Sequence, residues 1–168
     1  SPVLRTGIDS TVYYIDFSFD KLKLGGSAFA QSLDKIGKEV PTVQDSEYFA
    51  NAFNAVQELI NKELILAGHD ISAGGMITTM LEMNFANTEG GLEVSLDEIP
   101  EKDLVKILFS ENPGILIQVE KTDEVEKILK KAGVAFIRLA RPCDERHLLI
   151  HKDGADYQFF IDHLRDVW

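Results

Sequence analysis

The stretch Gly114-Ile-Leu-Ile-Gln-Val119, with the residues that follow it, decides the fold class of this 168-residue chain. Its run of apolar and β-branched residues is typical of a buried strand. Apolar residues then recur at helical spacing from about Asp123 to Ala132, and Gly133 is placed to end that helix. Because Val134–Leu139 is again apolar, the sequence predicts one β-α-β unit.

More strands flank this unit. Downstream, His147–Ile150 and Tyr157–Ile161 are separated by the turn signal Lys152-Asp153-Gly154, which predicts a β-hairpin. Upstream, the β-branched and aromatic run Thr11–Phe17 predicts a strand, and Leu92–Leu96 alternates apolar and polar residues as a half-buried strand does. No internal repeat or low-complexity linker divides the chain, so we expect a single domain over residues 1–168.

Two helices are expected in the first third of the chain. One follows Gly25-Gly26-Ser27 and ends at Gly37. Its apolar face would consist of Phe29, Leu33 and Ile36. The next begins near Asp45-Ser46, where a short polar side chain caps the first turn. Its apolar face would consist of Phe49, Phe53, Val56 and Ile60.

A strand, a loop and a helix follow. Leu64–Ala67 predicts a short buried strand, His69–Gly75 predicts a loop, and Met76–Ala86 predicts a helix. Asp103–Phe109 predicts a further short amphipathic helix. The pattern predicts an α+β or mixed α/β fold with a central mixed β-sheet covered by helices.

The composition excludes several classes of function. The 17 Lys and Arg residues against 28 Asp and Glu residues give a net charge of −11, which repels nucleic acids and anionic membranes. No apolar run approaches the roughly 20 residues that span a bilayer. The single Cys143 forms no internal disulfide, so a cytoplasmic location is expected. Because the chain opens at Ser1 without Met and stops at Trp168, we expect an excised domain, with proteolytic processing as the alternative.

The loop His69-Asp-Ile-Ser-Ala-Gly-Gly75 carries the strongest chemical signal. Asp70 offers a hard oxygen ligand suited to Mg²⁺. Ser72 can hydrogen-bond a phosphate, while Gly74 and Gly75 let backbone N–H groups at a helix start approach an anion. The same residues would also serve simply as a helix cap and a turn. His69 could pack, carry a proton or bind a metal.

Two other segments also combine turn residues with polar groups that could serve a ligand site. Gly25-Gly26-Ser27 could accept a phosphate, although tight packing on a neighbouring segment accounts for it better. In Phe109-Ser-Glu-Asn-Pro-Gly114 the last two residues alone account for a turn, and Glu111 could reach a site. The sequence lacks the signatures of serine hydrolases, zinc proteases and Walker-type NTPases, and Cys143 has no obvious activating partner.

Three segments in this order resemble the phosphoribosylformylglycinamidine synthases. They are Leu24-Gly-Gly-Ser-Ala-Phe-Ala-Gln31, His69–Gly75 with Leu81-Glu-Met-Asn-Phe-Ala86, and Leu108-Phe-Ser-Glu-Asn-Pro-Gly114. Essentially the whole chain is similar to the second aminoimidazole-ribonucleotide-synthetase-like C-terminal domain of the large, single-chain enzymes, just upstream of their glutaminase domain. The resemblance implies a sheet with helices, partly ferredoxin-like in topology.

The family consists of ATP-dependent ligases of purine biosynthesis. With Mg²⁺ and ammonia from glutamine, they convert formylglycinamide ribonucleotide to its amidine after phosphorylating the amide oxygen. The resemblance implies half of a site for a Mg-bound ATP or ADP, in which Asp70 binds Mg²⁺, Ser72 binds the phosphates, and Gly74 and Gly75 shape the loop. The other ligands would lie on an N-terminal synthetase-like domain. The chain alone, with no catalytic residue of its own, is therefore expected to be inactive.

One position departs from the family pattern. Ala73 stands where the family usually has Asp or Glu directly before the glycine pair. A non-catalytic scaffold domain of the same enzyme is therefore an alternative. Another is a different member of the synthetase superfamily, such as a relative of selenophosphate synthetase or thiamine-phosphate kinase.

Overall fold

Strand β1 (Thr11–Asp16) lies inside the sheet in the computed structural model, which describes residues 1–168. It pairs antiparallel with β4 (Gly114–Val119) on one side and with β5 (Phe136–Cys143) on the other. β4 and β5 therefore run parallel to each other, joined by helix α5 (Thr122–Lys131). The predicted β-α-β unit is confirmed, but it is a split unit that holds β1 in its middle, the ferredoxin-like arrangement.

The sheet has seven strands in the order β2-β4-β1-β5-β3-β6-β7. Its remaining strands are β3 (Gly91–Ser95) and β6 (His147–Lys152) in the interior and β2 (Ala67–Asp70) and β7 (Ala155–Phe160) at the two edges. β3 and β6 pair parallel, whereas all other neighbours pair antiparallel, so the sheet is mixed as predicted. The predicted hairpin is confirmed as β6 and β7.

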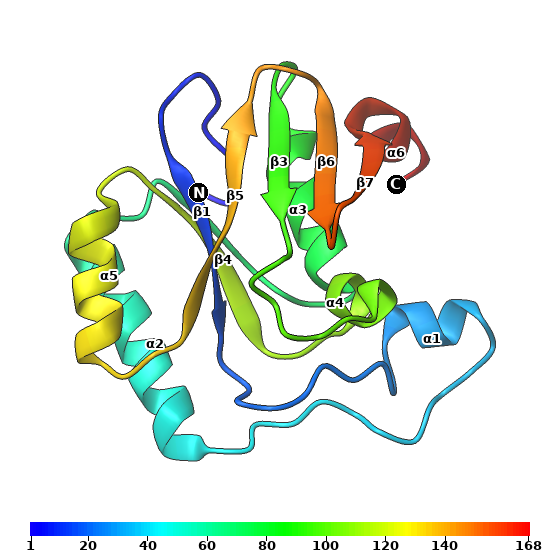
Figure 1. Cartoon of the computed structure of the whole chain (residues 1–168), viewed down its shortest axis with the longest axis horizontal. Coiled ribbons are helices and arrows are strands. Elements are labelled where there is room, and N and C mark those ends of the chain that lie inside the picture. The colour runs from blue at the N-terminus through cyan, green and yellow to red at the C-terminus, as the bar shows by residue number, and fades with distance from the viewer.

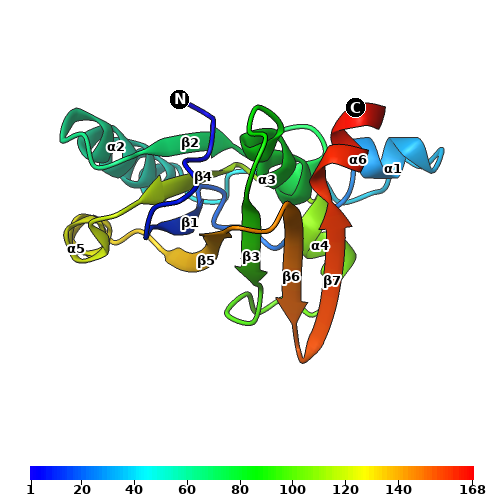
Figure 2. The ribbon, with the colours of Figure 1, turned by 90° about the horizontal axis from the view of Figure 1, so that it is seen from above.

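Helices cover the two faces of the sheet at opposite ends (Figures 1 and 2). Tyr13 and Ile15 of β1 face a core shared with α2 (Ser46–Asn61) and α5. Val12 and Tyr14, on the opposite face of the same strand, belong to a second core. This second core packs against α3 (Gly75–Phe85), α4 (Leu104–Phe109) and α6 (Ile161–Val167). Alternation along one strand thus divides the apolar residues between two layers.

The other face of β5, β3 and β6 carries no helix: Figure 1 shows these strands in front of α3 with nothing over their near side. Burial along β6 alternates accordingly, because Leu148, Ile150 and Lys152 are buried and the residues between them are not. The Lys152 ammonium is accommodated by donating to the carbonyls of Leu96 at 3.2 Å and Ile99 at 3.1 Å. No helix is long and apolar enough to cross a membrane.

Helix α1 (Ala28–Ser32) is shorter than predicted. Ser27 caps it through its side chain, as a Ser before a helix should. The chain then turns back, because the N–H of Gly26 donates to the Ile36 carbonyl instead of leaving Ile36 in a helix. Ile36 is consequently 78% exposed, and the prediction of a helix continuing to Gly37 is wrong.

The buried face of α2 is also shifted from the predicted one. The helix begins at Ser46 with Asp45 as its cap, as predicted. Of the four residues expected on its apolar face only Val56 is buried, while Phe53 and Ile60 are each 49% exposed. The remaining buried residues are Ala52, Ala55 and Leu59. The small side chains of Ala52 and Ala55 let the helix approach the sheet, whereas the large side chains of Phe53 and Ile60 lie outside the contact.

Two further boundaries differ from prediction. β2 covers Ala67–Asp70 instead of Leu64–Ala67, since its polar last residues pair with Leu116 and Ile115 of β4. Leu64 lies in the turn after α2, where its N–H donates to the Leu59 carbonyl. Helix α6 was not predicted, since the strand Tyr157–Ile161 was the last element that the sequence indicated.

Candidate functional site

The loop after β2 leads directly into α3. Asp70 is the last residue of β2, and the N–H of Ile71 donates to the Gly114 carbonyl at 2.9 Å, so the loop leaves the sheet beside the start of β4. Gly74 has a φ of 87° and precedes the first helical residue, Gly75. The predicted strand, glycine loop and helix are therefore present.

The carboxylate of Glu111 joins this loop to the start of α1. Its Oε1 accepts a hydrogen bond from the N–H of Gly74 at 2.9 Å and another from the N–H of Ala28 at 2.7 Å. The glycine-serine segment before α1, the loop before α3 and the segment before β4 thus meet at one side chain. Sequence reasoning placed Glu111 within reach of a site, and the structure places it at this junction.

Gly75 packs tightly against the end of α4. A Cβ added there would lie 2.6 Å from the carbonyl oxygen of Leu108 and 2.8 Å from Phe109 Cα, and its φ of 75° disfavours any other residue. Its N–H donates to the Ser72 carbonyl at 3.0 Å. Gly74 and Gly75 therefore shape the loop, and their own N–H groups are engaged within the chain.

The polar groups left free on the loop belong to Ser72, Ala73 and Asp70. The Ser72 and Ala73 N–H groups and the Ser72 hydroxyl make no hydrogen bond within the chain, and both residues are exposed. The side chain of Asp70 is 78% exposed. These groups form a short, accessible surface of donors with one carboxylate beside it, which suits a phosphate and a divalent cation.

His69 has both ring nitrogens beside acceptors. Nδ1 lies 2.8 Å from the Asp70 carbonyl, and Nε2 lies 3.3 Å from a carboxylate oxygen of Glu82 on α3. The imidazole thereby links the end of β2 to α3. Of the roles that the sequence leaves open, the geometry fits the structural one.

Asn112 is a positioning residue that the sequence reasoning missed. Its side chain is 1% exposed and donates to Ser18 Oγ at 3.2 Å and to the Lys21 carbonyl at 3.0 Å. It also accepts from the N–H of Lys23 at 3.3 Å. Asn112 thereby fixes the segment that leads from β1 toward α1. Its signal in the sequence was an amide in a turn that Pro113-Gly114 already explained.

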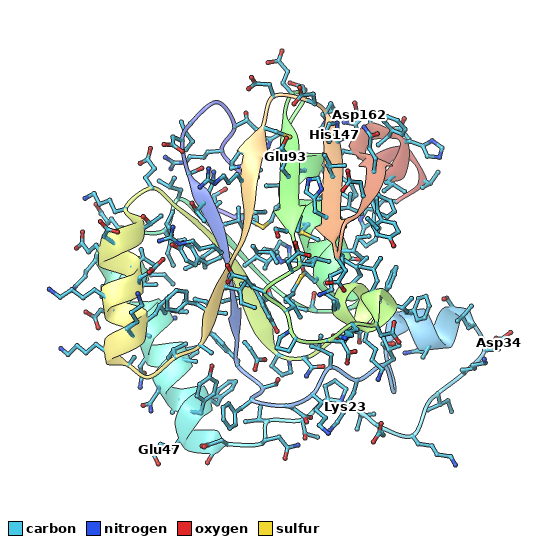
Figure 3. The ribbon with its side chains drawn as sticks, viewed as in Figure 1. Lys23, Asp34, Glu47, Glu93, His147 and Asp162 are labelled. Carbon is cyan, nitrogen blue, oxygen red and sulfur yellow. The ribbon has the colours of Figure 1, made fainter.

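A cavity of about 420 Å³ opens beside α1 and gathers positive charge in this acidic chain. Its lining includes Lys23, Lys35, Lys38 and Lys106. Lys23 pairs with Asp20 at 2.7 Å (Figure 3 labels Lys23). Although burial raises the pKa of Asp20, hydrogen bonds from Lys23 and from the Thr42 N–H outweigh it and lower the pKa to about 2. This basic cavity was not anticipated, because its lysines are scattered along the sequence.

Residues 11–148 match the family described as "AIR synthase related protein, C-terminal domain". The chain belongs to this family. A protein named probable phosphoribosylformylglycinamidine synthase, chloroplastic/mitochondrial, from Arabidopsis thaliana is 36% identical over 96% of this chain. One from Caenorhabditis elegans is 34% identical over 100% of this chain. This AIR synthase related domain spans only 12% and 14% of these relatives' lengths.

Solved structures share the fold of this AIR synthase related domain. "T. maritima PurL complexed with ATP" matches 97% of this chain and 27% of that one, with a TM-score of 0.72 and 15% identity. "T. maritima PurL complexed with FGAR" matches 97% of this chain and 28% of that one, with a TM-score of 0.71 and 20% identity. The predicted fold class is thereby confirmed.

Proposed function

We propose that this domain is part of a phosphoribosylformylglycinamidine synthase, the ATP- and glutamine-dependent ligase that converts formylglycinamide ribonucleotide to its amidine in purine biosynthesis. The observation that carries the proposal is identity of 34–36% over 96–100% of the chain to proteins of that name. The meeting of the three resembling segments at Glu111 supports it. Solved structures with the same fold also support it, since they are described as complexes of T. maritima PurL with ATP and with FGAR.

The domain contributes half of a Mg-nucleotide site. Asp70 supplies one carboxylate to Mg²⁺, and this suffices when phosphate oxygens and water fill the remaining positions. The Ser72 hydroxyl and the free N–H groups of Ser72 and Ala73 would hold a phosphate, while Gly74 and Gly75 keep the loop in shape. Because Ala73 acts through its backbone here, the missing carboxylate at this position removes a side-chain ligand but no backbone donor.

The remaining ligands lie on an N-terminal synthetase-like domain of the parent protein, and a glutaminase domain follows downstream as a further partner. Large apolar side chains are exposed near α1, as expected for a surface covered by another domain. They are Leu33 (52%), Ile36 (78%) and Val40 (50%). The basic cavity beside α1 would draw an anionic ligand toward this end of the domain. A cytoplasmic location stays a prediction.

The test compares the parent protein with its Asp70→Asn variant. We expect the variant to lose Mg-dependent nucleotide, measured by releasing bound nucleotide and quantifying it, because the amide binds Mg²⁺ poorly. Asp9→Asn, at an exposed position in the N-terminal segment, is the matched control. Retention of nucleotide and activity in Asp70→Asn would instead establish the scaffold alternative.

A second measurement uses the 168-residue chain alone. We expect no ATP hydrolysis dependent on formylglycinamide ribonucleotide and at most weak binding of Mg-ATP, because half of the ligands are missing. Turnover by the isolated chain would contradict the half-site.

A further inference from the structure

A cluster of metal-binding side chains lies at the turn between β5 and β6, outside the nucleotide loop. Cys143 Sγ, a carboxylate oxygen of Glu145 and a ring nitrogen of His147 all lie within 4.8 Å of one another. Cys143 ends β5, His147 begins β6, and Glu145 lies in the turn that joins them. The three side chains therefore come from one short connection that crosses the end of β3.

Strand β3 lies between the two strands that carry Cys143 and His147. Cys143 pairs with Gly91, and on the other side of β3 Leu92 pairs with Leu148, which places His147 beside Gly91. Residues two apart share a face of a sheet, so Cys143 and His147 lie with Glu93 on the face that carries no helix. Figure 3 shows Glu93 and His147 together at this end of the sheet. Gly91 has no side chain to separate the two.

The turn is held in a fixed position. Arg146 donates through Nη1 to the carbonyls of Asn84 at 3.2 Å and Gly90 at 3.1 Å, and through Nε to Asp162 at 3.0 Å. A Cβ added at Gly91 would lie 2.6 Å from the Glu145 carbonyl oxygen and 2.8 Å from the backbone nitrogen of His147. The backbone between the ligands is thus preorganised, which lowers the entropy lost when they close on an ion.

His147 has a nitrogen that the protein leaves without a partner. Nδ1 lies 3.2 Å from the side-chain amide of Gln158 on β7, whereas Nε2 is buried and makes no hydrogen bond. The Gln158 atom that faces Nδ1 is the amide nitrogen. A turn of about 180° of this amide brings its oxygen to Nδ1–H and frees the Nε2 lone pair for an ion. Metal-bound histidines commonly have this arrangement, in which a hydrogen bond to one nitrogen orients the other.

We propose that Cys143, Glu145 and His147 bind a thiophilic divalent cation of the Zn²⁺ class, with water as the fourth ligand. Thiolate and imidazole favour such an ion over Mg²⁺, which requires oxygen ligands. Bonds of about 2.0–2.3 Å in a tetrahedral site place ligand atoms roughly 3.3–3.8 Å apart, so about 1 Å of side-chain movement closes the cluster. The exposed Glu145 can supply that movement.

The local charge also favours a cation. The carboxylates of Glu93 and Glu145 lie close enough to Cys143 to act on it electrostatically. The same two carboxylates attract a divalent ion, and its binding displaces the thiol proton. The chain offers the ion no competing cysteine, because Cys143 is its only one.

The experiment titrates the reduced 168-residue chain with Co²⁺ as a spectroscopic probe and then displaces it with Zn²⁺. We expect one equivalent to bind with a thiolate-to-cobalt charge-transfer band. Cys143→Ser should abolish the band, and Glu145→Ala should weaken Zn²⁺ binding by more than about 10-fold. His163→Ala, at an exposed histidine of α6, should leave the band and the affinity unchanged.

Two results would overturn the site. One is the absence of a charge-transfer band at one equivalent of Co²⁺ in the parent chain. The other is a Glu145→Ala variant that binds Zn²⁺ as tightly as His163→Ala does, which would mean that Cys143 binds the ion without the cluster. Glu145 is exposed in a turn, so its variant stays folded even if Cys143→Ser does not.

Discussion

The Glu111 carboxylate accepts a hydrogen bond from the N–H of Gly74 at 2.9 Å, directly before the first turn of α3. Backbone N–H groups at a helix start normally face solvent or an external anion. Here the Glu111 carboxylate takes the place of that external anion at one N–H group. It also accepts a hydrogen bond from the N–H of Ala28 and so connects α1 to the loop. The N–H groups of Ser72 and Ala73 are left without a partner within the chain, and the proposed half-site assigns the phosphate to them.

Replacing Glu111 should therefore loosen the loop. We expect Glu111→Ala to lower the free energy of unfolding by about 2–3 kcal/mol, because two hydrogen bonds to a charged acceptor are lost. Glu111→Gln retains an oxygen acceptor and should cost about 1 kcal/mol. Urea denaturation measures both, with Glu98→Ala as an exposed control. Equal losses for the two substitutions would indicate that the charge alone matters.

Gly75 and Gly133 together separate the cost of backbone strain from the cost of steric overlap. At Gly133 the φ is 68° and no atom lies within 4 Å of an added Cβ, so Gly133→Ala introduces strain only. We expect Gly133→Ala to cost about 1 kcal/mol and Gly75→Ala roughly 3–4 kcal/mol, since Gly75 also meets the Leu108 carbonyl. Thermal unfolding of both variants tests this. Similar melting temperatures would contradict the close approach of α3 to α4.

Asn112 should contribute to the free energy of unfolding through its buried hydrogen bonds. Its three hydrogen bonds to the segment after β1 are made by a buried group, and Asn112→Ala leaves their partners unsatisfied. We expect a loss of about 2–3 kcal/mol, measured by denaturant unfolding. Asn54→Ala on the exposed side of α2 is the control and should not destabilise. A loss below 1 kcal/mol would indicate that water replaces these contacts.

The Glu126 network predicts a dependence of stability on pH. Glu126 accepts hydrogen bonds from Lys130 at 2.9 Å, Arg138 at 2.7 Å and Tyr13 at 2.9 Å. The Lys130 bond, with those from Arg138 and Tyr13, lowers the pKa of Glu126 from 4.5 to about 2 in spite of some burial. The stabilisation is therefore complete above pH 4.5 and is lost as the pH falls toward 2.

Glu126→Gln tests this dependence. At neutral pH the substitution should lower the free energy of unfolding by about 1–2 kcal/mol, and the difference from the parent should shrink steadily below pH 4.5. Glu120→Gln, exposed just before α5, should show no such trend. A pH-independent difference would mean that packing, and not charge, accounts for the loss.

Most of the fold follows from local sequence signals. β4 was predicted to the residue, and α5 and the β6-β7 hairpin within a few residues, because their periodicity and turn glycines agree with tertiary packing. The insertion of β1 into the β-α-β unit was not predicted, because the family resemblance implied only a partly ferredoxin-like topology. The buried face of α2 was misplaced, since alanines that allow close packing carry little hydrophobic signal.

The candidate site was predicted less completely. Asp70, Ser72, Gly74 and Gly75 lie together in one loop as expected, but their roles as ligands stay predictions. The engagement of the Gly74 N–H by Glu111 depends on contact between segments 37 residues apart, which local patterns do not encode. For the same reason the lysines of the basic cavity and the partners of Asn112 became visible only in the fold.

The position of β1 makes the first residues of the chain the closing strand of the sheet. Thr11 pairs with Val119 and Val12 with Ala140, so the centre of the sheet joins opposite ends of the sequence. Before β1 pairs, β4 and β5 have no strand between them. Each of them then has an unpaired edge that can form hydrogen bonds with another chain. Closing so long a loop is slow. A chain that loses its first 16 residues should therefore aggregate while its local helices still form.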